Sequence, residues 1–183
     1  MATVLIPLAE GFEELEAVTI IDLLRRAEIE VVTASLDGQT VTASRGTRVV
    51  ADTSVDKVLE QDFDMVVLPG GLPGADHLDA DDRIHKILQR TAENDRPIGA
   101  ICAAPKVLAS GGLLDHKKAT AYPGVLDPLS LASTQITDAA VQQDGNILTS
   151  RGPGTAMDFA LEIIACLAGS EKRDEVEAAL LRS

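Results

Sequence analysis

Short apolar runs alternate along the chain with longer stretches in which apolar residues recur at helical spacing. Runs such as Val4–Leu8 and Met65–Leu68 contain no charged residue, which is typical of strands buried on both faces. Their alternation with amphipathic stretches predicts βαβ units, and therefore an α/β fold with a mostly parallel sheet covered by helices on both faces. The predicted strands are Val4–Leu8, Glu30–Ser35, Met65–Leu68, Ile98–Ile101, Lys118–Ala121 and two hairpins, Thr40–Ala43 with Arg48–Ala51 and Val141–Gln143 with Ile147–Ser150. The predicted helices are Phe12–Ala27, a short one opened by a capping box at Thr53–Asp56, Asp81–Asn94, Pro105–Ala109, Phe159–Leu167 after a capping box at Thr155–Asp158, and Glu171–Leu181.

The carboxyl ends of the predicted strands indicate where a functional site lies. In sheets of this kind, ligands bind outside the carboxyl ends of the strands. Strands end at Leu8, Leu68 and Ile101, and each is followed by a turn. These three turns are the predicted walls of the site.

One carboxylate lies on the apolar side of the first predicted helix. At ~100° per residue from Phe12, Glu16 falls at about 40°, in the middle of the arc that holds Ile20 and Leu23. Glu14 falls on the polar side, as an ordinary solvated charge does. Burial raises the pKa of a carboxyl, so Glu16 is a candidate to donate a hydrogen bond to a thiolate or to act as a general acid or base. The alternative is a salt bridge, or a position close to water in the first turn.

The segment from Ala100 to Ala104 has the pattern of a nucleophile elbow. Cys102 stands between an apolar strand and Pro105, which suits the first turn of a helix. The small residues around Cys102 leave room for a sharp strand-to-helix turn that exposes one side chain. A thiol at a helix N-terminus is predicted to have a lowered pKa, which points to covalent catalysis or redox sensing. The alternative is a small buried core thiol.

The turn Pro69-Gly70-Gly71 is a candidate for the binding of an oxyanion. Its backbone N–H groups can approach a ligand closely, and the N–H of Ala103 can supply the second donor. A plain tight turn is the alternative. No Lys-Ser or Lys-Thr pair follows these glycines and no GxGxxG pattern is present, so a nucleotide phosphate loop is not predicted.

Composition narrows the class of protein. With 183 residues, of which 45% are hydrophobic, one domain spanning 1–183 is expected. The formal net charge of −13 argues against nucleic acid and anionic membranes as partners. No signal peptide or membrane span is apparent, and the two cysteines do not form a disulfide framework, so a cytoplasmic protein is expected. Cys166 lies in an apolar helical stretch and is predicted to be an inert core thiol. The three histidines lack metal-ligand spacing, so no metal is predicted.

Four segments together resemble the ThiJ/PfpI superfamily, in the branch of the parkinsonism-associated protein deglycase and bacterial YajL. They are Gly11–Glu16, Val66–Gly71, Ala100–Pro105 and Leu148–Thr155, in the family's order along nearly the whole chain. The resemblance implies a flavodoxin-like three-layer sandwich, a homodimer and a reactive, easily oxidised Cys102. It also implies that a protonated Glu16 touches the sulfur, with Gly71 and Ala103 lining the oxyanion site. It implies no cofactor.

The chain departs from the family pattern at several positions. Tyr122 stands where the branch often has a histidine, and is only a weak substitute base. Ala43 replaces a cysteine of some relatives. Ala103 stands where the protease branch has a histidine, so neither a Cys-His protease nor a glutaminase is predicted.

Two functions follow from the resemblance. The first is a cofactor-free enzyme that converts methylglyoxal or glyoxal to lactate or glycolate, or removes early glycation adducts from proteins and nucleotides. The second is a chaperone or oxidative-stress sensor that responds to oxidation of Cys102. A hydrolase of another amide or nitrile-like substrate is a third possibility.

Overall fold

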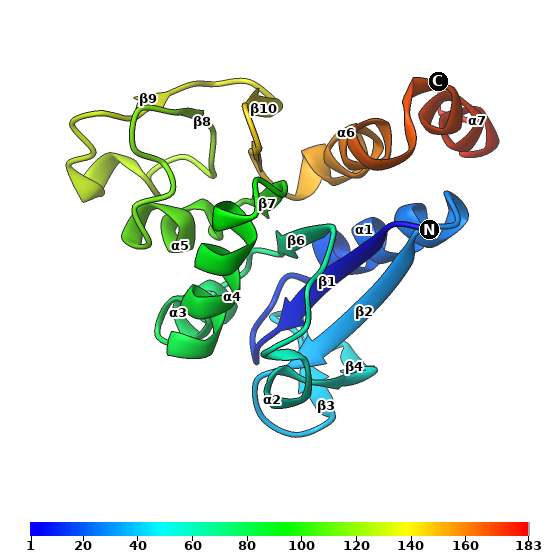
Figure 1. Cartoon of the computed structure of the whole chain (residues 1–183), viewed down its shortest axis with the longest axis horizontal. Coiled ribbons are helices and arrows are strands. Elements are labelled where there is room, and N and C mark those ends of the chain that lie inside the picture. The colour runs from blue at the N-terminus through cyan, green and yellow to red at the C-terminus, as the bar shows by residue number, and fades with distance from the viewer. Residues whose placement is uncertain (183) are drawn as a thin grey trace.

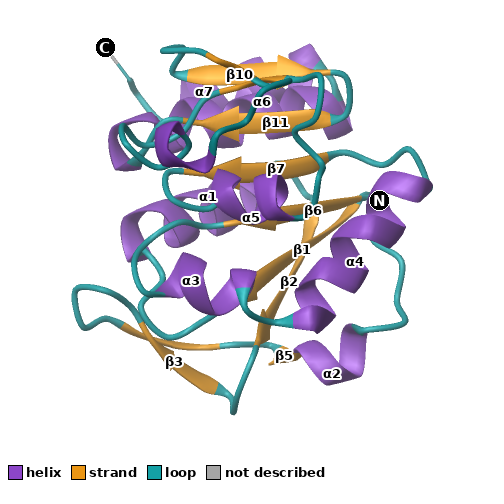
Figure 2. Cartoon of the chain, turned by 90° about the vertical axis from the view of Figure 1, so that its left-hand side faces the viewer, coloured by secondary structure: helices purple, strands orange, loops and turns teal. Residues whose placement is uncertain are grey.

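A seven-stranded sheet forms the centre of the computed structural model, which describes residues 1–182 (Figures 1 and 2). The strands follow the order β10-β11-β7-β6-β1-β2-β5, and every neighbouring pair is parallel except β10 with β11. The strands of this sheet are β1 (Thr3–Leu8), β2 (Glu30–Ser35), β5 (Thr53–Ser54), β6 (Met65–Leu68), β7 (Ile98–Ile101), β10 (Val141–Asp144) and β11 (Ile147–Ser150). Two small ladders pair β3 (Thr40–Thr42) with β4 (Arg48–Val50), and β8 (Lys118–Ala119) with β9 (Gln135–Ile136).

Helices cover both faces of the sheet. One face packs against α1 (Glu14–Arg26), α6 (Ala156–Ala168) and α7 (Ser170–Ala179). The other packs against α2 (Val55–Val58), α3 (Gly74–Asp79), α4 (Asp82–Glu93) and α5 (Pro105–Ser110). Along β1, Ile6 and Leu8 face the first layer and Leu5 faces the second, because side chains alternate along a strand. The expected three-layer, flavodoxin-like α/β fold is confirmed.

Several boundaries differ from the sequence predictions. Residues 53–54 are a strand rather than a helix start, and Ser54 caps α2 without a side-chain hydrogen bond, so the first predicted capping box is wrong. The second is also wrong, because the Thr155 hydroxyl accepts from the N–H of Gly152 instead of capping α6. The predicted strand Lys118–Ala121 is shorter than expected, and α3, which has no long amphipathic pattern, was not predicted. Two 3₁₀ turns, Asp127–Leu129 and Pro153–Thr155, complete the structure.

Cys166 does not lie in the core. It is exposed on α6, whereas Ile163 and Ile164 of the same apolar run are buried. A helix buries only the stripe that faces its neighbours, so an apolar run can leave one small side chain on the outside. The prediction of a core thiol at this position is wrong.

The strand order reverses between β1 and β6. The chain leaves β1 for β2 on one side, and later returns to β6 on the other side. Such a reversal of strand order opens a gap at the carboxyl ends, where open α/β sheets bind ligands. The turns after β1, β6 and β7 meet at this edge.

Candidate active site

Cys102 occupies a strained turn between β7 and α5. Its φ is +63°, in the left-handed region that residues with a side chain rarely adopt. Its N–H donates to the carbonyl of Ser150 at 2.9 Å, and Pro105 opens the helix that follows. The side chain is partly exposed. This is the geometry of a nucleophile elbow.

Glu16 projects from α1 into the interior, as its position on the helical wheel predicts. The residue is 0% exposed, and its Oε2 accepts a hydrogen bond from the N–H of Gly70 at 2.8 Å. Its Oε1 is also buried and has no nitrogen or oxygen partner among residues 1–182. Burial raises the pKa of Glu16 to about 7, although hydrogen bonds with Cys102 and Gly70 oppose the shift. The carboxyl therefore carries a proton for much of the time near neutral pH.

Gly70 and Gly71 let the backbone approach the thiol. A Cβ at Gly70 would lie 2.7 Å from the Cβ of Cys102 and 2.8 Å from Oε2 of Glu16. Gly71 has a φ of +90° and would place a Cβ on the backbone of residues 11–13. Hydrogen bonding from the N–H groups of Gly71 and Ala103 favours the thiolate form of Cys102 and so lowers its pKa, against the larger effect of burial. Two donors at one atom are the arrangement expected of an oxyanion site.

The thiol and the carboxyl titrate as a pair. Burial, followed by the charge of an ionised Glu16, raises the pKa of Cys102 to about 12. The prediction of a lowered pKa is wrong, because α5 has only six residues and its dipole does not offset burial beside a carboxylate. Between pH values of about 7 and 12 the pair therefore holds one negative charge and one proton.

Tyr122 lies beside the elbow rather than within the pair. Its N–H donates to the carbonyl of Cys102 at 2.9 Å, and its side chain is about half exposed. Its ring lies against Gly152, and together with the segment 151–155 it lines a shallow cavity. The structure thus brings together Cys102, Glu16, the two glycines and Ala103, and leaves the phenol at the margin.

Glu13 also belongs to the site, although no sequence pattern indicated it. Its N–H donates to the carbonyl of Gly70 at 2.9 Å, and so holds the peptide whose other end is the N–H of Gly71. The contact joins backbone atoms far apart in sequence, so periodicity carries no signal for it.

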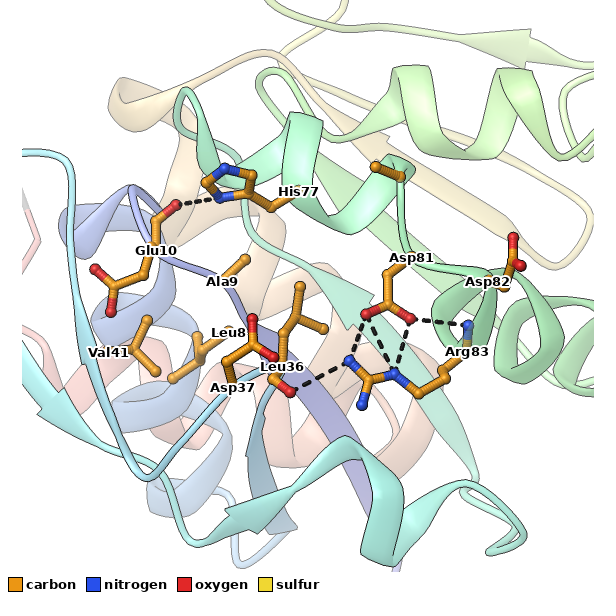
Figure 3. Close-up of a pocket in the computed structure, with 11 residues that line it drawn as sticks. Leu8, Ala9, Glu10, Leu36, Asp37, Val41, His77, Asp81, Asp82 and Arg83 are labelled. Carbon is orange, nitrogen blue, oxygen red and sulfur yellow. Dashed lines mark hydrogen bonds and ion pairs between the residues drawn. The ribbon is translucent and has the colours of Figure 1, made fainter.

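A separate cavity of about 500 Å³ opens where β1 and β2 end (Figure 3). The only arginine of its wall, Arg83, donates to Asp81, to Asp56 and to the carbonyl of Leu36. His77 hydrogen-bonds the carbonyl of Glu10. No cysteine of residues 1–182 lines the cavity, and its arginine is already paired with carboxylates. The chemistry of the described residues is concentrated at Cys102.

Two kinds of feature are absent from residues 1–182. Within this range, no three or more His, Cys, Asp or Glu side chains form a group that could hold a metal ion. Nor does any helix of these residues have the length and apolar character needed to cross a membrane.

Comparison with known proteins gives a consistent result. The model of the DJ-1/PfpI family matches residues 2–166. Protein dj-1beta of Drosophila melanogaster is 43% identical over 97% of this chain and 95% of its own length. Protein DJ-1 homolog A of Arabidopsis thaliana is also 43% identical over 98% of this chain, but the chain spans only 46% of that relative.

Two more relatives bear on structure and function. The solved structure of oxidized Toxoplasma gondii DJ-1 covers all of both chains with a TM-score of 0.95 and 38% identity. A Caenorhabditis elegans relative named glutathione-independent glyoxalase DJR-1.2 is 33% identical over 96% of this chain and 92% of its own. The match of the family model and these identities confirm the resemblance seen in the sequence. This chain belongs to the DJ-1/PfpI family.

Proposed function

We propose that this protein is a cofactor-free, cysteine-dependent enzyme that converts small reactive dicarbonyls to hydroxy acids, methylglyoxal to lactate and glyoxal to glycolate. The observation that carries the proposal is the buried carboxyl of Glu16, which shares a hydrogen bond with the elbow thiol of Cys102. A nucleophile and a proton carrier side by side are what an internal proton transfer needs. The glyoxalase name of one relative supports the same reaction class.

The first step is addition of the Cys102 sulfur to the aldehyde carbon. The reactive form of the pair carries its negative charge on sulfur, where Gly71 and Ala103 donate, and its proton on Glu16. A new carbon–sulfur bond forms, and the carbonyl oxygen takes the proton from Glu16 to give a hemithioacetal. The N–H groups of Gly71 and Ala103 stabilise the charge that develops on that oxygen.

The second step moves a proton between the two carbons. The ionised Glu16 removes the proton from the carbon that bears sulfur, which gives an enediolate, and returns it to the neighbouring carbon. The hydroxyl proton on the first carbon's oxygen passes to the oxygen of the second carbon, so the first becomes a carbonyl. The product is a thioester of lactate on Cys102. Water then cleaves the carbon–sulfur bond, so that one dicarbonyl and one water give one lactate and regenerate the thiol.

The test is formation of lactate from methylglyoxal without glutathione. We expect turnover by the reduced wild type and none by Cys102→Ala. Cys166→Ser is the matched control, because it removes the exposed thiol, and it is expected to retain activity. Loss of activity in a folded Cys166→Ser protein, or equal turnover by Cys102→Ala, would contradict the proposal.

Deglycation is the same chemistry on an early adduct of cysteine, lysine or arginine. Free methylglyoxal is in equilibrium with such adducts, so its removal also lowers their level. Incubation of a preformed adduct with a scavenger that traps released methylglyoxal distinguishes the two activities. Faster repair with enzyme than with scavenger alone would support direct deglycation.

A redox-responsive chaperone or sensor is the second candidate function. The partly exposed Cys102 has two N–H donors that would hold the oxygens of a sulfinate as well as a substrate oxyanion, and the Toxoplasma relative is described as oxidized. Titration with peroxide, followed by intact mass and by assays of aggregation of a client protein, tests this function. Holdase action that appears only after oxidation, with no turnover in the reduced state, would favour it over the enzyme.

We further propose that two copies associate through the α1–α6 layer. Leu15 and Val18 of α1 are about half exposed, as is Met157 in the first turn of α6. Burial of such apolar side chains stabilises association. Sedimentation should give twice the mass of the chain for the wild type and a monomer for Val18→Asp.

A further inference from the structure

A second set of contacts surrounds the first turn of α1, next to Glu16. The tip of the β3–β4 hairpin, the loop between the two strands, forms hydrogen bonds with this turn through both backbone and side-chain atoms. The N–H of Ser44 donates to the carbonyl of Phe12 at 2.8 Å. Its hydroxyl lies 2.9 Å from Oε2 of Glu13 and 3.2 Å from Oε2 of Glu14. The hairpin tip is thereby fixed to the residues that precede Glu16.

Glu13 links this tip to the oxyanion site. Its side chain accepts from Ser44, while its N–H holds the carbonyl of Gly70 at 2.9 Å. The N–H of Gly71, at the other end of the same peptide unit, is one of the two groups whose hydrogen bonding favours the Cys102 thiolate. Because a peptide unit is planar, fixing its carbonyl also fixes the direction of its N–H.

We propose that Glu13 and Ser44 form a clasp that holds the Gly70–Gly71 peptide and the first turn of α1 against Cys102, which makes Glu13 a positioning residue of this site. This inference deepens the proposed function, because it concerns how the same thiol is prepared for reaction. Glu13 touches neither the sulfur nor a substrate and acts through its neighbours.

The charge of Glu13 supports the same role. Repulsion from an ionised Glu13 adds to burial in raising the pKa of Glu16. The negative charge of Glu13 therefore keeps a proton on the Glu16–Cys102 pair to higher pH. Glu14 has a different structural role. Burial raises its pKa, but hydrogen bonds from the backbone of residues 14, 45 and 47 and from the Thr47 hydroxyl outweigh that effect and lower it. It anchors the hairpin and contributes no repulsion that registers at Glu16.

The test uses alkylation of Cys102 by iodoacetamide as a function of pH, in a Cys166→Ser background. This readout needs no substrate, so it is independent of whether the protein turns over methylglyoxal. Glu13→Gln keeps an acceptor for Ser44 but removes the charge, and should move the midpoint of the alkylation profile to lower pH by a few tenths of a unit. Glu14→Gln is the matched control, with the same change of charge in the same turn, and should leave the midpoint in place.

The hydroxyl of Ser44 is tested separately. Ser44→Ala removes the donor and should slow alkylation at fixed pH by about fivefold, the equivalent of one hydrogen bond. Ser44→Thr restores a hydroxyl and should recover most of the rate. Equal shifts for both glutamine variants, no shift for Glu13→Gln, or a Ser44→Ala protein that reacts like the wild type would each overturn the clasp.

Discussion

The two cysteines of this chain have the same side chain but differ in exposure, in backbone conformation and in the groups that surround the sulfur. Cys166 is exposed on the outer side of α6, and burial of part of its surface is the only cause that raises its pKa. Cys102 is less exposed, sits at a φ of +63° and has a carboxyl and two N–H donors against its sulfur. Among the described residues, the more accessible thiol has no carboxyl or N–H donor that affects its pKa, whereas the less accessible one has both.

This difference shows why exposure is a poor guide to a reactive thiol. A thiolate needs a place for its proton and donors for its charge. Around Cys102 those needs are met by Glu16 from α1, by Gly71 from the turn after β6 and by Ala103 from the elbow itself. Around Cys166 nothing equivalent is present among the described residues.

The largest effect we predict comes from removal of the proton carrier. Glu16→Gln keeps the size of the side chain and an acceptor for the N–H of Gly70, but the new amide cannot exchange a proton. Turnover of methylglyoxal should fall by about 10²- to 10⁴-fold, in line with the usual contribution of a general acid or base. The rate at which a maleimide labels Cys166 should be unchanged in the same protein. Activity close to wild type would remove Glu16 from the mechanism and with it the main difference between the two thiols.

The same substitution should stabilise the fold at high pH. The pKa of Glu16 is about 7 in the folded chain against 4.5 for an ordinary glutamate, so the unfolded chain loses its proton first as the pH rises. Between these values the wild type progressively loses stability, up to about 3 kcal/mol above pH 7. Glu16→Gln does not titrate, so its advantage in urea unfolding should be about 3 kcal/mol at pH 8 and vanish below pH 4.5. A constant difference across this range would mean that the carboxyl is not protonated in the fold.

Two glycines, one near each cysteine, extend the comparison of the Cys102 and Cys166 regions. Gly71, beside Cys102, and Gly169, three residues after Cys166, have φ values of +90° and +89°. A Cβ at Gly71 overlaps the backbone of the turn before α1, whereas a Cβ at Gly169 meets no atom within 4 Å among the described residues. Both alanine variants carry the cost of a left-handed backbone, and Gly71→Ala should lose about 2 kcal/mol more in the free energy of unfolding. Equal losses of unfolding free energy for the two variants in urea titrations would show that the turn at Gly71 can accommodate a Cβ.

Part of this site could be predicted from the sequence because its signals are local. The helical spacing identified the burial of Glu16, and the strand followed by small residues and Pro105 identified the elbow. The pKa of Cys102 was predicted in the wrong direction, because the helix start is visible in sequence while the neighbouring carboxylate is not. Contacts such as Ser44 with Glu13 join residues about thirty positions apart and have no periodic pattern.

For the fold too, local patterns in the sequence were predictive, and features that depend on tertiary packing were not. Unbroken apolar runs and their alternation with amphipathic stretches were sufficient for the layers and the parallel strands. The short helix α3 was missed because six residues complete less than two turns and show no period. The exposure of Cys166 could not be read from an apolar run, since which side of α6 is covered depends on where α1 and α7 pack.

The smallest effect concerns Tyr122, which lies at the margin of the site. Its phenol is about half exposed, and its contact with the elbow is made by its backbone N–H, which any residue except proline provides. Tyr122→Phe keeps the ring against Gly152 and should change kcat for methylglyoxal by less than about threefold, the effect of one exposed hydroxyl. Tyr122→Ala also removes the ring from the wall of the cavity, so it should raise KM more than it lowers kcat. A hundredfold loss of kcat in Tyr122→Phe would instead make the phenol a proton-transfer group, and the Cys102 site would then depend on two proton carriers rather than on Glu16 alone.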